Sequence, residues 1–352
     1  MIALLLGACD VREEKIEFKP VRFAEIPGWE SDDHAAAFGA LLKSCRKIKA
    51  PNTACEAALK LGDGMDRETA RAFFETHYLP HAVKGGEKGF VTGYYEPEVK
   101  GARQRGGEFT VPVYARPGDL ITLKPDDERA RFNGEITGLR ETTDGPKPYY
   151  TRGEIDGGAL DGRGLELLYL DDPVELFFMQ VQGSGRVRLE DGKAVRLGFA
   201  AKNGHPYTSI GKRLVEMGEG KPADLTMQGV KAWLRADPER ARKLMHQNKS
   251  YVFFREIDGD GPIGAQGVAL TPERSLAIDT EYHRLGLPVF VAAPDLTAPD
   301  GTKFRRLMVA QDVGSAIRGP ERGDIYWGSG EAAGDIAGRT RHAAKFTVLL
   351  PK

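Results

Sequence analysis

Apolar residues recur at helical spacing in two segments of the first eighty residues. Residues 31–49 read SDDHAAAFGALLKSCRKIK, and their apolar positions fall on one helical face: Phe38, Leu41, Leu42, Cys45 and Ile48. Ser31 stands where a capping hydroxyl is expected, and Asp66 stands in the same position in DRETARAFFETHY, residues 66–78. We therefore predict two capped helices near the N-terminus.

From residue 89 the hydrophobic pattern is that of short strands. GFVTGYYEPEVKGAR (89–103) is strand-like and is interrupted by Pro97 before a glycine turn. Asp191-Gly192 stands between two alternating runs and predicts a β-hairpin. Up to about residue 200 we expect mostly β segments: FTVPVYA, ELLYL and VELFFMQVQGSGRVRLEDGKAVRLGFA.

Helical signals return between residues 208 and 247. TSIGKRLVEMG (208–218) is one predicted helix, Thr226 caps a second, and Asp237 precedes Pro238 at the first position of a third. From residue 250 onward strands dominate again: SYVFFRE, LAIDTEYHRLGLPVFVAA, FRRLMVAQDVGSAI and AAKFTVLLP. The whole pattern predicts a mainly β protein with helices at the N-terminus and in the middle.

Composition restricts the classes of partner. The 352 residues suffice for two domains, and 50 Lys and Arg balance 51 Asp and Glu, so no net charge favours nucleic acid or anionic lipid. After the first residues no apolar run approaches the ~18–20 residues that span a bilayer. We expect a soluble body that binds no nucleic acid.

The N-terminus MIALLLGACDVREEK resembles a bacterial lipoprotein signal, because Leu6-Gly7-Ala8 precedes Cys9. It lacks a basic segment, and its apolar run is shorter than the ~7–15 residues of an ordinary signal core. Cys9 is therefore a candidate lipidation site, with a misassigned start, a truncated chain or an unremarkable terminus as the alternatives.

The remaining cysteines, Cys45 and Cys55, lie ten positions apart across a turn at Pro51-Asn52. In an oxidising compartment they would close a disulfide between two helices, and otherwise they would be two reduced core thiols. No CxxC or Cys/His spacing indicates zinc, and no metal is expected.

Two glycine-rich stretches suggest motifs that the sequence then excludes. GSGEAAGDIAG (328–338) looks like a dinucleotide loop, but no acidic residue follows Asp335 and no βαβ unit fits in the remaining chain. We expect its glycines to form tight turns near a cleft. QVQGSGRV (180–187) is not a G-x-S-x-G nucleophile elbow. Gln182 and Ser184 are better suited to hydrogen bonding with a substrate, or to a bulge or hairpin turn.

Two further segments combine aromatic and polar side chains as sugar-binding surfaces do. AAKNGHPYTSIGKRL (200–214) carries Lys202, Asn203 and His205 in a loop, which could equally be a structural cap of the next helix. TGYYEPE (92–98) brings two tyrosines and Glu96 to the end of a strand, where a buried aromatic pair is the alternative.

The aspartates near the C-terminus are the candidates for acid–base chemistry. Asp324 precedes Ile325-Tyr326-Trp327, an apolar setting that raises a carboxyl pKa and suits a proton donor. Asp312, before Val313-Gly314, could instead accept backbone hydrogen bonds and stay ionised. Asp279 lies at another strand end.

Taken together, these stretches resemble the MltA family of lytic transglycosylases. The matching pieces run in the family's order from about residue 90 to the end: TGYYEPE, PYYTRGEI, FFMQVQGSGRV, KNGHPYTSIGK, NKSYVFF, LTPERSLAID and AQDVGSAIRGPERGDIYWGSGEAAGDIAG. The resemblance implies a double-psi β-barrel of residues 18–100 and 248–352, with a three-aspartate region at about 265–350. It implies an inserted β-domain at 101–247, a groove between the two, and a signal-like segment at 1–17.

The resemblance also implies the reaction. An exolytic transglycosylase would cleave the β-1,4 bond between N-acetylmuramic acid and N-acetylglucosamine and form a 1,6-anhydro product without water. Asp324 would act first as acid and then as base, while Asp312 would order the loop that presents it and Asp279 would support the site. Substrate contacts would come from both domains: Thr92, Tyr94, Gln182, Ser184, Lys202, Asn203 and His205.

The family implies a monomer without cofactor that acts on peptidoglycan on the periplasmic side of the envelope. It would be an outer-membrane lipoprotein anchored at Cys9 or a soluble periplasmic protein. Two rival hypotheses remain: a non-catalytic glycan-binding protein, and a true hydrolase in which Asp312 and Asp324 act as a pair.

Overall fold

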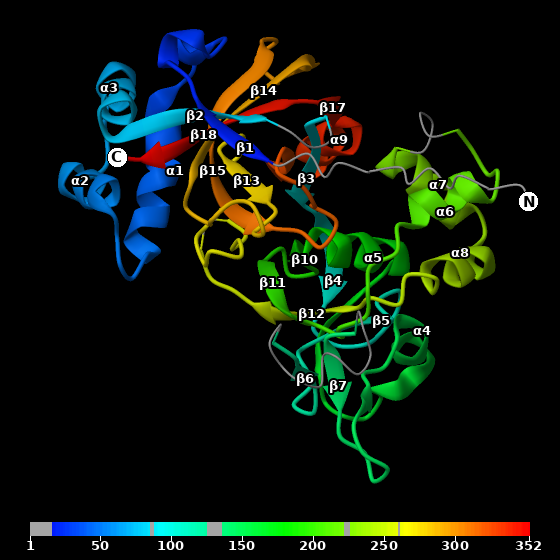
Figure 1. Cartoon of the computed structure of the whole chain (residues 1–352). Helices are drawn as coiled ribbons and strands as arrows, with labels where there is room; N and C mark the ends of the chain where they lie inside the picture. Colours follow the sequence, from blue (N-terminus) through cyan, green and yellow to red (C-terminus); the bar gives the residue numbers. More distant parts are fainter. Residues whose placement is uncertain (1–15, 85–87, 125–135, 222–225, 260) are drawn as a thin grey trace, which may run out of the picture.

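The computed structural model describes residues 16–84, 88–124, 136–221, 226–259 and 261–352. Its main feature is a nine-stranded sheet built from both ends of the chain (Figure 1). Most neighbouring strands are antiparallel, but β13 and β15 are parallel, as are β16 and β3. In spatial order its strands are β1 (Glu17–Pro20), β2 (Tyr78–Lys84), β18 (Lys345–Pro351), β14 (Pro288–Thr297), β15 (Lys303–Val313), β13 (Ser275–Ile278), β16 (Arg322–Ser329), β3 (Phe90–Glu96) and β17 (Arg341–Ala343).

This sheet curls around one apolar core, as a barrel does. Buried side chains from seven of its strands meet there, among them Val91, Val291, Phe304, Ile325 and Phe346. Helix α9 (Glu331–Arg339) packs against β3 and β16 and contributes two alanines to the same core. Burial of apolar side chains from distant parts of the sequence is the driving force that closes the sheet.

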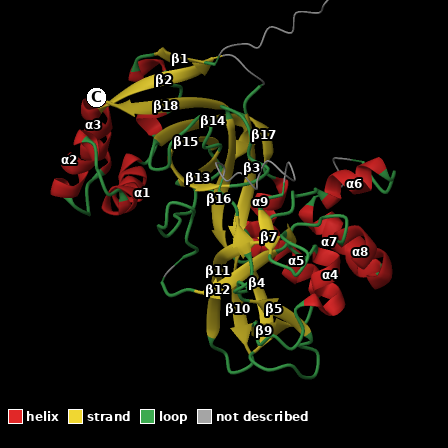
Figure 2. Ribbon diagram, turned by 60° about the horizontal axis from the view of Figure 1, so that its bottom comes forward, coloured by secondary structure: helices red, strands yellow, loops and turns green. Residues whose placement is uncertain are grey.

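A second, six-stranded sheet lies beside the barrel, and a small three-stranded sheet adjoins it. Figure 2 shows helices gathered on one side of the six-stranded sheet, where α5 packs on its apolar face. Its strands are β12 (Val252–Glu256), β11 (Ala194–Lys202), β10 (Ser184–Leu189), β4 (Glu98–Ala102), β9 (Glu166–Leu170) and β5 (Val111–Tyr114). The small sheet consists of β6 (Ile121–Thr122), β7 (Gly138–Arg140) and β8 (Lys147–Pro148). The helices of this part of the chain are α4 (Arg152–Glu154), α5 (Pro173–Gln182), α6 (Ile210–Glu216), α7 (Met227–Ala236) and α8 (Pro238–Met245).

The expected mainly β architecture is confirmed, but the predicted limits of the insert are displaced. β4 already pairs with β10 of the second sheet, so the crossing lies at Pro97 rather than at residue 100. β12 pairs with β11, so the second sheet continues to Glu256 and does not end at residue 247. Apolar strand patterns look alike in either sheet, and only the pairing partner distinguishes them.

One predicted strand is a helix. VELFFMQVQ lies in α5, which begins after Asp172, whose carboxylate accepts a 2.7 Å hydrogen bond from the Val174 amide. Gly183 ends it with a φ of 79°. The helix is buried on most sides, so its sequence carries a continuous apolar run instead of a helical stripe. Such a run does not distinguish a buried helix from a buried strand.

The glycine-rich segment 328–338 was expected to form turns; Gly328 and Gly330 do turn the backbone, with φ of 113° and 84°, but the residues from Glu331 form α9. Gly334 lies against the ring of Tyr95, and a Cβ placed on Gly334 would come within 2.7 Å of that ring. The glycine at this position permits close packing of the helix on β3.

The helices predicted at residues 66–78, 208–218 and 226–247 are present, and α2 (Thr53–Leu61) is a third N-terminal helix beyond the two that were predicted. Asp66 caps α3 (Arg67–His77), and Thr226 and Asp237 cap α7 and α8. The hairpin across Asp191-Gly192 joins β10 and β11. In α1 (His34–Lys47) the cap is Asp33, which accepts from the Ala36 amide, and not Ser31.

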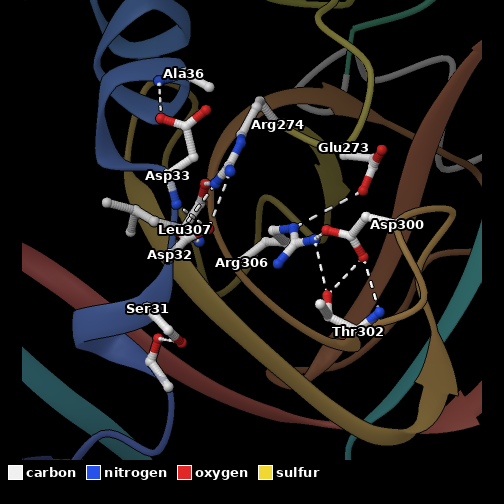
Figure 3. A network of polar contacts seen from close by, with 11 residues as sticks. Ser31, Asp32, Asp33, Ala36, Glu273, Arg274, Asp300, Thr302, Arg306 and Leu307 are labelled. Carbon is white, nitrogen blue, oxygen red and sulfur yellow. Dashed lines mark hydrogen bonds and ion pairs between the residues drawn. The ribbon is translucent and has the colours of Figure 1, made fainter. Parts of the chain in front are cut away.

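A disulfide joins Cys45 on α1 to Cys55 on α2 (Thr53–Leu61), with the two Cα atoms 5.2 Å apart. The disulfide alternative is therefore the correct one. The N-terminal helices are also tied to the barrel by a buried ion pair, in which the Arg274 guanidinium donates two 2.9 Å hydrogen bonds to Asp32 (Figure 3). The Asp32 carboxylate also accepts from the Leu307 amide of β15, so the helices are held to the sheet in a defined position.

Candidate active site

Four adjacent strands bring the predicted site residues into one row. On β13, Ala277 pairs with Asp312 of β15 on one side and with Asp324 of β16 on the other. Asp324 in turn pairs with Thr92 of β3. Ala277 is buried in a cluster with Tyr94 and Tyr326, so it places no polar side chain between the strands that carry the two carboxylates.

The same alternation separates the site from the core. Successive residues of a strand point to opposite faces, so Thr92 and Tyr94 share one face of β3 while Val91 points into the barrel. On β16, Asp324 and Tyr326 share the site face, and the rings of Tyr94 and Tyr326 lie 5.3 Å apart. The two tyrosines form part of a small apolar cluster beside the carboxylates.

Asp324 has one oxygen engaged and one oxygen open. The Thr92 hydroxyl donates a 2.6 Å hydrogen bond to Oδ1, and the Arg322 guanidinium donates a 2.8 Å hydrogen bond to that hydroxyl. Arginine can only donate, so the hydroxyl proton is directed to Asp324. No described residue donates a hydrogen bond to Oδ2 of Asp324. Oδ2 is therefore the oxygen that can carry the acidic proton.

The surroundings raise the pKa of Asp324 to about 6, chiefly because the carboxyl is buried. The Thr92 hydrogen bond and the Arg322 charge lower this pKa, and the nearby Asp312 carboxylate raises it. A carboxyl group with this pKa can give and take a proton near neutral pH. The sequence prediction of a raised pKa from an apolar setting agrees with this result.

Asp312 has no free carboxylate oxygen. Oδ1 accepts 2.9 Å hydrogen bonds from the amides of Ala265 and Val313, and Oδ2 accepts a 3.0 Å hydrogen bond from the Tyr94 hydroxyl. Burial raises the pKa of Asp312, and these three hydrogen bonds oppose the increase. A carboxylate whose oxygens are all occupied is a poor candidate for activating a water molecule.

The loop that leads into β16 is held by Asp279 rather than by Asp312, contrary to the sequence-based expectation. Asp279 is buried and accepts a 2.8 Å hydrogen bond from the Gly319 amide. The Arg318 guanidinium lies 3.5 Å from the other Asp279 oxygen. Asp312 instead organises the turn at Ala265 and the Tyr94 phenol. The two aspartates therefore have separate supporting roles.

On the insert side, Gln182 makes a structural hydrogen bond to the barrel, whereas Ser184 and Lys202 remain candidates for substrate contact. Oε1 of Gln182, at the end of α5, accepts a 3.0 Å hydrogen bond from the Tyr95 amide and so ties the insert to β3. Ser184 is buried at the start of β10, opposite Gly198. Lys202 is partly buried at the end of β11.

Asn203 and His205 were predicted to contact substrate, and the structure gives their side chains other partners. The Asn203 amide donates 2.8 Å hydrogen bonds to the carbonyls of Tyr150 and Lys249 and accepts one of 2.9 Å from the Tyr251 amide. Nε2 of His205 lies 2.7 Å from the Tyr149 carbonyl. Both residues hold the loop in place, which is the structural alternative that the sequence left open.

The sequence singled out Glu96, but it gave no indication of the partners of Glu96 or of the part that Arg322 plays. Arg322 lies two positions before Asp324 and acts on it through the hydroxyl of Thr92, which is 230 residues away from Arg322 in the chain. Glu96 is fully buried, accepts a 2.8 Å hydrogen bond from Arg196 of the insert, and accepts one of 2.7 Å from Ser329. The Ser329 and Tyr326 hydroxyls lie 3.3 Å apart, so this ion pair connects the insert to the site face. Only a fold that joins these segments reveals the connection.

Two features of the described residues complete the picture. No helix among them is long and apolar enough to cross a membrane. Within the same residues, no group of three or more His, Cys, Asp or Glu side chains is arranged to hold a metal ion. Cys9 lies outside the described residues.

Comparison with known proteins gives consistent matches. The family model for the MltA specific insert domain matches residues 90–255, and the 3D domain model matches residues 274–350. The membrane-bound lytic murein transglycosylase A of Escherichia coli K12 is 35% identical over 265 residues, and that of Vibrio cholerae is 33% identical over 266. The Escherichia coli alignment covers 73% of this chain and 64% of the relative, so the chain spans less than two thirds of that relative's length.

Solved structures agree over nearly the whole chain. A membrane-bound lytic murein transglycosylase from Agrobacterium tumefaciens has a TM-score of 0.88 and 38% identity, with 96% of this chain and 98% of that chain covered. MltA from Neisseria gonorrhoeae has a TM-score of 0.82 and 37% identity over 96% and 93% of the chains. Escherichia coli MltA with bound chitohexaose has a TM-score of 0.68 and 27% identity over 97% and 95%. The chain belongs to the MltA family.

Proposed function

We propose that the protein is a lytic transglycosylase of peptidoglycan. It cleaves the β-1,4 bond between N-acetylmuramic acid and N-acetylglucosamine and leaves a 1,6-anhydromuramyl end. The proposal rests on a difference in hydrogen bonding between the two aspartates. Asp324 has one carboxyl oxygen without a hydrogen bond and a pKa of about 6, whereas both oxygens of Asp312 accept hydrogen bonds. One available carboxyl group suits a reaction that consumes no water.

In the first step, protonated Asp324 donates its proton to the glycosidic oxygen as the bond from that oxygen to the muramyl C1 breaks. The leaving sugar takes the bonding electrons, and positive charge develops at C1 and its ring oxygen. In the second step, the Asp324 carboxylate removes the proton of the muramyl C6 hydroxyl, and O6 bonds to C1. The nucleophile belongs to the same sugar, so its high effective molarity replaces an activated water. Asp324 ends protonated, as it began.

Substrate contacts from both sides of the site are part of the proposal. Thr92 and Tyr94 line the barrel side, and Ser184 and Lys202 line the insert side, with Gln182 bracing the junction between them. A solved relative holds chitohexaose, which supports a site for a chain of N-acetylated sugars. In this proposal the glycan strand lies along the boundary between the two sheets, where β3 leads from the barrel sheet into the second sheet.

We propose a location on the periplasmic side of the cell envelope, because the substrate lies there and the curated relatives are named membrane-bound. A disulfide between Cys45 and Cys55 suits an oxidising compartment. Lipid anchoring through Cys9 and a monomeric state are proposed with it.

The test is a digest of purified peptidoglycan by the wild type and by Asp324→Asn, with the products resolved by mass spectrometry. Wild-type products lighter by one water than those of a hydrolase, and absent with the variant, are expected. Products with free reducing ends would instead support a hydrolase in which Asp312 takes part. No products from a folded, glycan-binding wild type would indicate a binding protein.

A further inference from the structure

Three cations form one row across neighbouring strands of the barrel sheet. Ala292 of β14 pairs with Arg305 of β15 on one side and with Lys345 of β18 on the other. The register of β18 with β2 places Lys84 opposite Lys345. Directly opposite residues of neighbouring strands lie on the same face of a sheet, so the three side chains share one face.

This cation row points away from the barrel core. Successive residues of a strand face opposite sides, and each cation has a core residue beside it in the sequence: Val83, Phe304 and Phe346. The side chains of Lys84 and Lys345 are exposed, and that of Arg305 is half-buried. None of the three forms a hydrogen bond or an ion pair with another described residue. The outer face therefore carries three positive charges without a direct partner.

The cation row borders a cavity of about 810 Å³ on the same face. The cavity has largely apolar walls, to which Val21, Ile26 and Phe290 contribute. Its lining also contains the three cations of the row and a fourth, Lys88. An apolar hollow with a basic border suits a partner that has both an anionic group and an apolar part.

Two acidic residues among the described ones line the cavity, and they do not cancel its charge. Glu25 is already paired with Arg22, whose guanidinium lies 3.0 Å away. Glu321 accepts a 2.8 Å hydrogen bond from the Phe346 amide. Burial raises the pKa of Glu321, and the charges of Lys345 and Lys84 oppose this increase. One half-buried carboxyl group stands against four cations, so the cavity favours an anionic partner.

The chain enters the barrel beside the cation row. Glu17 opens β1 opposite Lys84, and its carboxylate lies 3.4 Å from the Lys19 ammonium. Cys9 stands eight positions before Glu17. An extended chain covers at most ~3.6 Å per residue, so a lipid on Cys9 would hold Glu17 within about 29 Å of a membrane. The proposed anchor would thus keep the cation row near a bilayer.

We infer that the cation row and its cavity dock on a membrane surface that contains anionic phospholipids. The ammonium and guanidinium groups bind the lipid phosphates, and the apolar walls contact the glycerol and the first methylene groups below them. The inference goes beyond the proposed function, because it concerns how the protein is oriented in the envelope and not the reaction.

Binding to vesicles tests the inference. Full-length Cys9→Ser protein is the parent, so that no acyl chain contributes. Vesicles that contain phosphatidylglycerol supply the anionic headgroup, and vesicles of phosphatidylcholine alone are the neutral control. The row variant combines Lys84→Gln, Arg305→Gln and Lys345→Gln. The matched variant removes the same charges from exposed positions elsewhere, through Lys60→Gln, Arg105→Gln and Lys212→Gln.

We expect the parent to bind anionic vesicles and not neutral ones, and added salt to weaken the binding. Each lost cation should weaken it about fivefold, so the row variant should bind about a hundredfold more weakly. A variant with only the two exposed lysines changed should bind about 25-fold more weakly, and it provides the test if Arg305→Gln impairs folding. The matched variant should bind as the parent does.

Equal binding by the row and matched variants, or a parent without preference for anionic vesicles, would overturn the inference. So would a row variant that keeps vesicle binding and loses affinity for isolated peptidoglycan, because the row would then contact that polymer instead. The proposed lyase activity is judged separately, by the anhydro products formed without vesicles. The row variant should still form them, since none of its three positions lies in the row that holds Asp324.

Discussion

At the scale of single residues, the site depends on which atom is left without a partner. Thr92 occupies one oxygen of Asp324, and Arg322 compels Thr92 to act as the donor. Three donors occupy Asp312. The two aspartates have similar burial but different capabilities. Hydrogen bonds occupy both oxygens of Asp312, whereas Asp324 keeps one oxygen with which it can exchange a proton.

Thr92→Val should move the alkaline limb of the pH–rate profile upward. The Thr92 hydrogen bond stabilises the ionised form of Asp324 and lowers its pKa, so its loss raises that pKa from about 6. A hydrogen bond to a charged group contributes ~1.5–3 kcal/mol, which corresponds to a shift of about one pH unit or more. Thr92→Ser, which keeps the hydroxyl, should retain the wild-type profile. An unchanged limb in Thr92→Val would show that Thr92 does not tune the acid.

Asp324→Asn should make the folded protein more stable at neutral pH. Folding raises the pKa of Asp324 from 3.8 to about 6, so the folded state holds the proton more tightly and loses stability as pH rises through this interval. The variant has no carboxyl to ionise, and its advantage should reach up to about 3 kcal/mol above pH 6. Urea denaturation of both proteins at pH 4 and pH 7.5 measures this. Below pH 4 the two curves should converge, and a variant less stable than wild type at pH 7.5 would contradict the argument.

At the scale of elements, cross-links hold the N-terminal helices in place. Cys45 joins α1 to α2, and the buried pair of Asp32 and Arg274 joins the start of α1 to the barrel. The core of this helical layer also includes Phe290 and Leu307 from β14 and β15. The layer therefore supports the barrel from the side and contains none of the residues of the Asp324 row.

The double variant Cys45→Ala with Cys55→Ala should lose stability and keep activity. The disulfide closes a short loop, with a sequence separation of 10 residues, so its removal should cost about 2–3 kcal/mol through the entropy of the unfolded chain. Chemical denaturation with and without reductant measures this, and reduced wild type should resemble the variant. The rate of peptidoglycan cleavage at 25 °C should stay within about twofold, since the variant remains folded. A large loss of rate in a fully folded variant would show that the helices do affect the site.

At the scale of the whole molecule, the site lies where the chain passes from one sheet to the other. β3 carries Thr92 and Tyr94, then crosses at Pro97 into β4 of the insert. Glu96, at the crossing, pairs with Arg196 of β11 and with Ser329 of β16. This buried group joins three segments and sets how the insert stands against the site face.

Glu96→Gln should destabilise the protein by about 3 kcal/mol, because it leaves the largely buried Arg196 without its charge partner. Glu98→Gln is the matched control, since Glu98 pairs with Arg188 at a more exposed position and should contribute less than about 1 kcal/mol. Urea denaturation of the two variants at pH 7 tests the difference. Equal effects would mean that the buried pair contributes no more than a surface pair.

Much of the local structure follows from short patterns in the sequence. Capping residues such as Asp66 and Thr226 mark helix starts because their side chains bond to amides within three residues. The Asp191-Gly192 turn marks a hairpin for an equally local reason. Where a segment is uniformly apolar, as in α5, its hydrophobic pattern shows neither the helical nor the strand period. For this reason the prediction of a strand at α5 was wrong.

The sequence by itself determined the mainly β composition, most element positions and the three aspartates that resemble those of a known family. The tertiary structure decided which oxygens of Asp312 and Asp324 remain open, and that Asn203 and His205 brace a loop. The physical reason is distance along the chain: Thr92 meets Asp324 across 232 residues, and Tyr94 meets Asp312 across 218. Local patterns encode local hydrogen bonds, whereas chemistry at this site depends on contacts that exist only after the two ends of the chain share one sheet.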